Sequence, residues 1–341
     1  MKIFLIFSRK LTQESSIPPY GIMYIAAMLR KCDFNDLQLY DLAFHHEEAI
    51  IRDCATYRPD VIGLSSDSIS FERGAKLLRT IKNHYGGGVY LLGGVHPTIA
   101  PEQSLMETQA DAAIIGEGEL TVVEVMKKIA SSGRFNDIKG VAFCKDGRLV
   151  RNEPREFIQD LDVLPLPARD LLPMDKYLKT CPDLPMLYPT MTIMASRGCK
   201  ANCLYCQPVA RTLFGKRMRH RSVANILEEI IHLKKNYSFK SLYFIDDELL
   251  YNGRKWIEEL CTAFIEKNLK LNWVCQARVD QIDEDLVALM KKSGCYAIGF
   301  GVESGSQKIL NYMRKGYRVS QIEKAFDLCR RHKIVTTCNF M

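Results

Sequence analysis

The chain has 341 residues, of which 47% are hydrophobic and 26% are charged, and its formal net charge is +7. This length favours two domains or one large domain, and the composition is that of a globular protein with enough apolar residues for real cores. No apolar run reaches the ~18 residues of a membrane-spanning helix. The run after Met1 is also too short for a signal peptide. The mild charge gives only weak evidence for nucleic acid, which is therefore not an expected partner.

The sequence contains twelve cysteines. Most of them are scattered inside predicted strands and helices, and three are clustered. Because no export signal precedes them, we expect a reducing cytoplasm rather than a secreted, disulfide-bonded protein.

The first 131 residues alternate short apolar runs with longer helical patterns. The runs are rich in Val, Ile and Leu on both faces, which is typical of parallel strands covered by helices. Five such strands with helices between them predict a flavodoxin-like doubly wound parallel sheet. The expected strands are Lys2–Ser8, Leu37–Ala43, Val61–Asp67, Val89–Val95 and Ala112–Gly116, and the expected helices are Tyr20–Lys31, His46–Tyr57, Phe71–Tyr85, Pro101–Thr108 and Glu119–Ser131.

Glycines and small polar residues gather where three of these strands end. In doubly wound sheets ligands bind outside the carboxyl ends of the strands. Glycine lets a backbone approach a ligand closely, and serine hydroxyls donate hydrogen bonds without bulk. The alternative, with equal weight, is that these glycines only turn the chain between strand and helix. The candidate ligand-binding residues are Ser65, Ser66, Gly93, Gly94, Val95, His96, Gly116 and Glu117.

Two features separate this region from the rest of the chain. Asp146-Gly147 lies between two β-like runs and predicts a hairpin. Residues 151–190 are rich in proline, which blocks helix interiors and central strands and indicates an extended connector. We therefore expect a first domain at residues 1–139, a hairpin and connector at 140–190, and a second domain at 191–341.

The second domain begins a new βα series, which predicts a parallel barrel or part of one with its active site at the carboxyl ends of the strands. Ser222 and Asp283 are expected to cap helices, and Ser320 with Glu323 is expected to form a capping box. The expected strands are Met191–Ser196, Ser241–Asp246, Asn272–Arg278, Ala297–Glu303 and Val335–Met341.

Three cysteines follow the first strand of this series: Cys199, Cys203 and Cys206, in the spacing Cys-x3-Cys-x2-Cys. Thiolates are soft ligands that suit iron–sulfur clusters, zinc or copper. Three ligands on one loop can hold three corners of a 4Fe–4S cube and leave the fourth iron open for chemistry. The alternative is a structural zinc site with His220 or another cysteine as the fourth ligand.

Polar and charged residues end the next three strands. Acidic groups there could accept hydrogen bonds from an ammonium group, and an arginine could pair with a carboxylate. The alternative for each acidic residue is that it caps the helix that follows. These residues are Asp246, Asp247, Arg278, Glu303 and Ser304.

The cysteine loop, with Arg197-Gly198 before it and Tyr205 inside it, resembles the cluster loop of the radical S-adenosylmethionine (SAM) enzymes. YFIDDELL, VCQARVD and GFGVESGSQKIL resemble the same family, while LLGGVHPTIAPE and DAAIIGEGE resemble the cobalamin-binding domain that precedes it in one subclass. The resemblance implies a cluster on the three cysteines and SAM contacts from Tyr205 and the strand-end residues above. It also implies cobalamin contacts from the eight candidate residues of the first domain, without a histidine ligand from the loop after the first strand.

The family barrel has six strands, so the resemblance implies a partial (βα)6 barrel that stops in its fifth strand. Either the chain is a fragment, or a missing C-terminal segment or a partner chain supplies the rest. The implied function is a cobalamin-dependent radical SAM enzyme that transfers methyl to an unactivated carbon of an unidentified small molecule. It would take electrons from a donor such as flavodoxin or ferredoxin. The alternatives are a radical SAM cyclase or rearrangement enzyme that does not use methylcobalamin, and a non-catalytic cobalamin- or metal-binding module.

Overall fold

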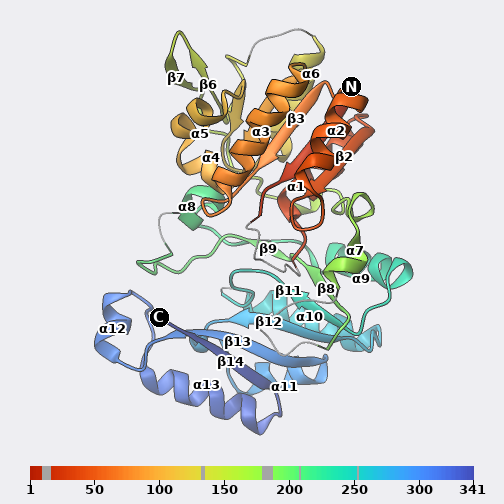
Figure 1. Ribbon diagram of the computed structural model, residues 1–341. Coiled ribbons are helices and arrows are strands. Elements are labelled where there is room, and N and C mark those ends of the chain that lie inside the picture. The colour runs from red at the N-terminus through yellow and green to blue at the C-terminus, as the bar shows by residue number, and fades with distance from the viewer. Residues whose placement is uncertain (10–16, 132–134, 179–186, 207–208, 252) are drawn as a thin grey trace. The chain divides into compact units, whose positions relative to one another are not determined.

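The structure is a computed structural model that describes residues 1–9, 17–131, 135–178, 187–206, 209–251 and 253–341 (Figure 1). Contacts within the chain divide it into two compact units. The first comprises Met1–Ile158 with Val163–Met174, and the second comprises Gln159–Asp162 with Asp175–Met341. No helix among these residues is long and apolar enough to span a membrane.

The first unit is built on one sheet whose strand order is β2-β1-β3-β4-β5-β6-β7. The first five strands are parallel, and the last two are antiparallel. The order 2-1-3-4-5 is that of flavodoxin-like sheets, so the predicted fold class is confirmed. The strands are β1 (Lys2–Phe7), β2 (Asp36–Asp41), β3 (Val61–Ser65), β4 (Val89–Gly93), β5 (Ala112–Ile114), β6 (Val141–Lys145) and β7 (Arg148–Arg151).

Helices cover both faces of this sheet, because the strand order reverses direction after β2. Helices α1 (Tyr20–Lys31) and α6 (Glu119–Ala130) pack together, while α2 (Glu47–Tyr57), α3 (Phe71–Tyr85) and α5 (Pro101–Thr108) form a second row. Between the sheet and that second row lies a core to which Ile6, Leu64, Leu78 and Leu92 belong. The predicted helices match these bounds within one residue.

One element of the first unit was not predicted. The strand expected to run to Val95 ends at Gly93, and a short helix, α4 (Val95–Ile99), follows at once. Gly94 makes this turn at φ +91°, in the region that favours glycine. An added Cβ at Gly94 would lie 2.8 Å from the carbonyl oxygen of Ser66, so the neighbouring loop also requires glycine here.

The predicted hairpin is present and extends the first sheet. Asp146 and Gly147 both have positive φ, at +50° and +73°, as a two-residue hairpin turn requires. The connector after it carries the short helices η1 (Leu161–Val163), η2 (Arg169–Leu171) and α7 (Met174–Tyr177). It lies along α1, because Ala168 N–H donates to the Met23 carbonyl at 3.2 Å and Arg169 Nη2 donates to Tyr20 Oη at 3.0 Å.

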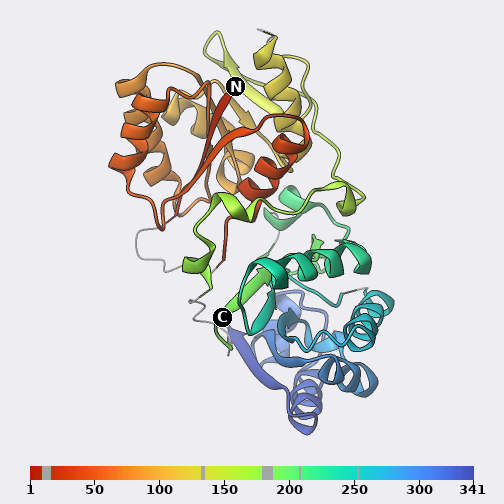
Figure 2. The ribbon, with the colours of Figure 1, turned by 90° about the vertical axis from the view of Figure 1, so that its right-hand side faces the viewer.

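The second unit is built on a parallel sheet of five strands in the order β14-β13-β12-β11-β8. The order runs in one direction, so right-handed crossovers place the helices between the strands on a single face. The row α9-α10-α11-α13 can be followed in Figure 2. The strands are β8 (Thr190–Ile193), β11 (Ser241–Phe244), β12 (Asn272–Ala277), β13 (Cys295–Glu303) and β14 (Val335–Phe340).

The helices of that row are α9 (Val223–Asn236), α10 (Arg254–Glu266), α11 (Glu284–Lys292) and α13 (Val319–Arg331). The remaining elements are the two-stranded ribbon β9 (Ser196–Arg197) and β10 (Arg219–His220), with α8 (Val209–Phe214), η3 (Val279–Gln281) and α12 (Gln307–Tyr312).

The strands of this sheet show a period of two in their chemistry. On the face toward the helices, Trp273 packs against Phe244 of β11 and Phe264 of α10. On the other face the residues are more polar: Gln276 Nε2 donates to Tyr243 Oη at 2.9 Å, and Thr190 and Ser241 share a hydroxyl hydrogen bond of 2.8 Å. One face therefore builds the core, and the other offers hydrogen-bonding groups.

Two of the three predicted caps are confirmed. Ser222 Oγ accepts from Asn225 N–H at 3.1 Å and Asp283 Oδ1 accepts from Leu286 N–H at 3.0 Å. The capping box expected of Ser320 and Glu323 is wrong, because α13 begins two residues earlier, after Arg318. The Gln321 side chain closes that turn by accepting from Arg318 N–H at 2.8 Å.

Candidate functional site

The cysteine loop begins where β9 ends. Gly198 turns the chain at φ +88°, and an added Cβ there would lie 2.6 Å from the Arg217 carbonyl oxygen. Cys203 is buried, Cys199 is half-buried and Cys206 is exposed, and all three are free thiols. The sequence therefore presents three thiols from one loop at the carboxyl end of the sheet, as predicted.

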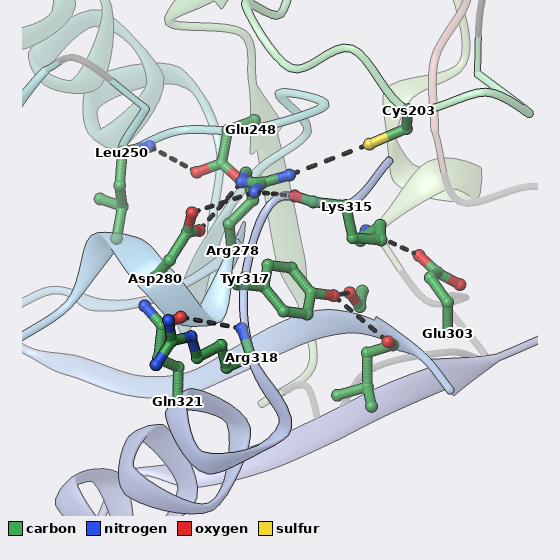
Figure 3. A network of polar contacts seen from close by, with 12 residues as sticks. Cys203, Glu248, Leu250, Arg278, Asp280, Glu303, Lys315, Tyr317, Arg318 and Gln321 are labelled. Carbon is green, nitrogen blue, oxygen red and sulfur yellow. Dashed lines mark hydrogen bonds and ion pairs between the residues drawn. The ribbon is translucent and has the colours of Figure 1, made fainter. Parts of the chain in front are cut away.

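The loop is fastened to the sheet and to a later segment. Leu204 N–H donates to the Met313 carbonyl at 2.9 Å, and Arg278 Nη1 lies 3.9 Å from Cys203 Sγ (Figure 3). The loop is therefore held at Leu204 by a backbone hydrogen bond and at Cys203 by the neighbouring guanidinium.

The chemistry of these donors fits an iron–sulfur cluster, since such clusters take cysteine thiolates. Among the described residues, no three His, Cys, Asp or Glu side chains are already gathered around a metal position. Burial raises the pKa of Cys199 to about 11 and also raises the pKa of Cys206, so cluster binding would release protons. His220, the alternative zinc ligand, stacks on Trp256 with ring centroids 4.7 Å apart.

The acidic residues after β11 have different surroundings. Asp246 is 4% exposed, and it accepts hydrogen bonds from Ala195 N–H at 3.1 Å and from Ser196 Oγ at 2.5 Å. It therefore joins the end of β11 to the end of β8, and burial raises its pKa to about 6. Asp247 is exposed. Glu248 is buried, accepts from Leu250 N–H at 3.0 Å, and has its pKa raised to about 8 by burial.

Arg278, at the end of β12, is held by the protein's own groups. Its Nε and Nη2 donate to the two carboxylate oxygens of Asp280, at 3.0 Å each. Its guanidinium carbon lies 5.2 Å from the Tyr251 ring centroid and 5.1 Å from that of Tyr317. Arg278 also donates to the Lys315 carbonyl. The sequence predicted that Arg278 pairs with the carboxylate of SAM, and that contact stays a prediction; in the structure its guanidinium is paired with Asp280.

Glu303, at the end of β13, forms a closed group with Tyr205 and Lys315. Tyr205 Oη donates to Glu303 Oε1 at 2.7 Å, and Lys315 Nζ lies 3.0 Å from Tyr205 Oη and 3.1 Å from Glu303 Oε1. The next residue, Ser304, accepts from Ser306 N–H through its hydroxyl at 3.1 Å. The structure thus joins two predicted SAM residues, Tyr205 and Glu303, directly to each other.

Sequence reasoning missed the residues that complete these contacts. Asp280 and Tyr317 surround Arg278, and Lys315 comes from the turn between α12 and α13. None of them ends a strand, although Asp280 is the last residue of the VCQARVD segment. The sequence offered one weak signal, the glycine at position 316 between Lys315 and Tyr317, which marks a turn. In the structure Gly316 has φ +80°.

In the first unit, hydrogen bonds join the three predicted ligand loops. Ser66 N–H donates to the Gly93 carbonyl at 3.2 Å, and His96 N–H donates to the Ser66 carbonyl at 3.1 Å. Thr98 Oγ1 donates to the Gly94 carbonyl at 2.7 Å and accepts from Gly116 N–H at 3.1 Å. The carboxyl ends of β3, β4 and β5 therefore form one connected edge.

Within this edge, the predicted residues differ in what they face. Added Cβ atoms at Gly93 and Gly116 would meet no atom of the described part of the chain within 4 Å, so their backbone is open there. The Ser66 hydroxyl is buried. Glu117 faces the connector instead, because its Oε2 accepts from Ile158 N–H at 2.8 Å. Ser65 and Val95 are half-buried.

His96 belongs to the same edge and packs by its ring. The ring stacks on Phe71 with centroids 4.1 Å apart, and Nδ1 lies 3.1 Å from Ser68 Oγ. Burial lowers the pKa of His96, which favours the neutral ring. Residues 10–16 of the loop after β1, where the sequence lacks a histidine, lie outside the described residues.

Two family models match the chain and divide it as the folds do. The "B12 binding domain" matches residues 10–126, and the "Radical SAM superfamily" matches residues 193–341. The chain belongs to the radical SAM enzymes with an N-terminal cobalamin-binding domain. The two matches place the connected loops of this radical SAM protein in its cobalamin-binding domain and the cysteine loop in its radical SAM domain.

Relatives agree with this assignment, and a solved structure shares the fold. An uncharacterized methyltransferase of Pyrococcus horikoshii is 31% identical over 89% of this chain and 64% of its own length. An anaerobic magnesium-protoporphyrin IX monomethyl ester cyclase of Synechocystis is 27% identical over 96% of this chain and 65% of its own length. The cobalamin-dependent SAM radical enzyme OxsB with aqua-cobalamin bound matches with a TM-score of 0.86 at 21% identity, over 100% of this chain and 49% of OxsB. The chain thus spans about two thirds or less of each protein.

Proposed function

We propose that this protein is the cofactor-binding part of a cobalamin-dependent radical SAM methyltransferase that acts on an unactivated carbon. The observation that carries the proposal is the presence, in one chain, of an open glycine edge in a B12-binding domain and a three-cysteine loop in a radical SAM domain. The substrate is a small molecule whose class the chain does not identify.

The bound cofactors would supply one-electron cleavage of SAM to methionine and a 5′-deoxyadenosyl radical, together with a transferable methyl group. Cys199, Cys203 and Cys206 hold the cluster in this proposal. Asp247, which is exposed beside the buried Asp246, accepts hydrogen bonds from the SAM ammonium group. Tyr205, Glu303 and Ser304 line the same edge.

In the first domain, the backbone of Gly93 and Gly116 approaches cobalamin, since no side chain among the described residues covers either position. Ser65, Ser66, Val95 and His96 surround these glycines. The electron needed for SAM cleavage comes from a donor such as flavodoxin or ferredoxin. A low-potential cluster requires a reducing compartment, so the proposed location is the cytoplasm.

A second candidate function is radical cyclisation without methyl transfer. The relative from Synechocystis, named as a cyclase, matches 96% of this chain and favours it. The two reactions differ in product mass, because methylation adds one methyl group to the substrate.

The deciding experiment is anaerobic purification and reconstitution, followed by quantitation of iron, sulfide and cobalamin. The expected result is about four irons per chain, one cobalamin, and reductive formation of 5′-deoxyadenosine from SAM. Absence of both cluster absorbance and SAM cleavage would instead support a non-catalytic cobalamin- or metal-binding module.

A further inference from the structure

The turn between α12 and α13, Met313–Tyr317, carries a lysine that lies among the cluster-loop contacts. Arg314 has φ +57° and Gly316 has φ +80°, so the backbone on both sides of Lys315 takes the left-handed conformation. Lys315 N–H donates to the Leu310 carbonyl at 3.0 Å, and the residue is only 5% exposed. Burying a lysine is costly unless its charge is paired, so this arrangement requires a compensating interaction.

The compensation comes from Glu303, which is itself 7% exposed. Lys315 Nζ lies 3.1 Å from Glu303 Oε1. Glu303 takes φ +63°, an uncommon conformation for a residue with a side chain. An added Cβ at Gly301 would lie 2.8 Å from Glu303 Oε1, so glycine at 301 leaves room for the carboxylate. The left-handed backbone on both sides of Lys315, the positive φ of Glu303 and the glycine at position 301 therefore all accommodate one buried ion pair.

The Met313–Tyr317 turn contacts the cysteine loop directly at two points and through Arg278 at a third. Its Met313 carbonyl accepts from Leu204 N–H at 2.9 Å. Lys315 Nζ lies 3.0 Å from the Tyr205 hydroxyl, one residue before Cys206. The Lys315 carbonyl accepts from Arg278, whose Nη1 is 3.9 Å from Cys203 Sγ (Figure 3).

We propose that Lys315 is a positioning residue for the cysteine loop, and that contacts from the Met313–Tyr317 turn hold Cys203 and Cys206 in position. The inference deepens the proposed function and rests on it, because it concerns how the cluster is retained. Lys315 acts through Tyr205 and Glu303, and its buried charge also favours additional negative charge at the loop. Groups that orient metal ligands commonly alter metal affinity by about 10–100-fold when they are removed.

The test compares Lys315→Met, Tyr205→Phe and the control Lys291→Met with the wild-type protein. Lys315→Met removes the charge and keeps a side chain of similar length, whereas Tyr205→Phe removes only the hydroxyl and leaves the Lys315–Glu303 pair intact. Lys291 is a matched control in an exposed interaction, where its Nζ donates to the Lys333 carbonyl at 2.7 Å.

Three measurements follow on the full chain. After anaerobic reconstitution, iron release to a chelator is expected to be about 10–100-fold faster in Lys315→Met than in wild type, and several-fold faster in Tyr205→Phe. The cluster midpoint potential, followed by electron paramagnetic resonance, is expected to fall in Lys315→Met. In the cluster-free protein, thiol labelling of Cys206 is expected to accelerate in both variants and to stay unchanged in Lys291→Met.

The outcomes separate the inference from the proposed function. Wild-type rates of iron release and of Cys206 labelling in both variants would overturn the inference. A wild-type protein that assembles no cluster would overturn the proposed function, and the labelling rates would still decide whether Lys315 positions the loop. Should Lys315→Met fail to fold, Tyr205→Phe decides the question alone.

Discussion

The two parallel sheets of this chain build their ligand edges in different ways. In the first sheet the strand order reverses, helices cover both faces, and the edge consists of glycine backbone, hydroxyls and one histidine whose pKa is lowered by burial. In the second sheet the order runs one way, and the edge consists of thiols and buried ions such as Arg278–Asp280 and Lys315–Glu303. A backbone edge suits a large ligand approached closely, whereas charged side chains suit a small ionic one. The difference therefore supports the proposal that the two sheets hold separate cofactors.

The test with the largest expected effect removes the cysteine thiols from the carboxyl edge of the second sheet. Replacing Cys199, Cys203 or Cys206 by Ala is expected to reduce iron from about four atoms per chain to nearly none. Cobalamin content should stay at the wild-type level, because the first edge is untouched. Cys144→Ala, at an exposed position in the hairpin, is the control and should retain full iron. A triple variant that still binds four irons would refute the assignment.

The second test fills the backbone edge of the first sheet. Gly93→Val places a side chain where the structure has open space, so cobalamin binding should fall at least tenfold while thermal stability changes little. Gly94→Val should also lower the Tm, since it combines φ +91° with a 2.8 Å approach to Ser66. Cobalamin titration and thermal unfolding distinguish the two. Equal cobalamin affinity in Gly93→Val and wild type would place the ligand elsewhere.

A third test uses pH to probe the buried charges of the second edge. The pKa of Glu248 is raised to about 8 in the folded protein, so folding favours its protonated form. The stabilisation associated with that form is present at acidic pH and is lost as the pH rises toward 8. Glu248→Gln keeps an oxygen acceptor for Leu250 N–H and cannot ionise. The Tm of this variant relative to wild type should therefore increase between pH 5 and pH 9, and a constant difference would contradict the buried-acid assignment.

The smallest expected effect concerns local structure outside both edges. Asp283→Ala removes a helix cap and should cost about 1 kcal/mol of unfolding free energy, measured by urea denaturation. Ser320→Ala should cost almost nothing, because α13 begins after Arg318. Equal losses of unfolding free energy in the two variants would instead support the capping box that the sequence suggested.

Most of the fold could be predicted because it is encoded locally. Hydrophobic runs located the five parallel strands of each sheet, and short side chains such as Ser222 and Asp283 marked helix starts. The helix after Gly93 was missed because it begins without a linker and without an apolar repeat. The strand-end acids were found by position, but their partners were not. Lys315 reaches Glu303 through the fold of the turn between α12 and α13, for which a single sequence provides no spacing rule. Asp280 is only two residues from Arg278, so that pair is local, although nothing in its spacing marked it as an ion pair.

The hairpin at the end of the first sheet also affects whether two copies of this protein can pair through their sheet edges. An outermost strand exposes unpaired N–H and carbonyl groups, which can recruit a strand from another molecule. Strand β7 is only four residues long and carries exposed Arg148 and Arg151 at its two ends. Two like charges on so short a strand repel an identical strand, so the hairpin protects newly made chains from precipitating through this side of the sheet.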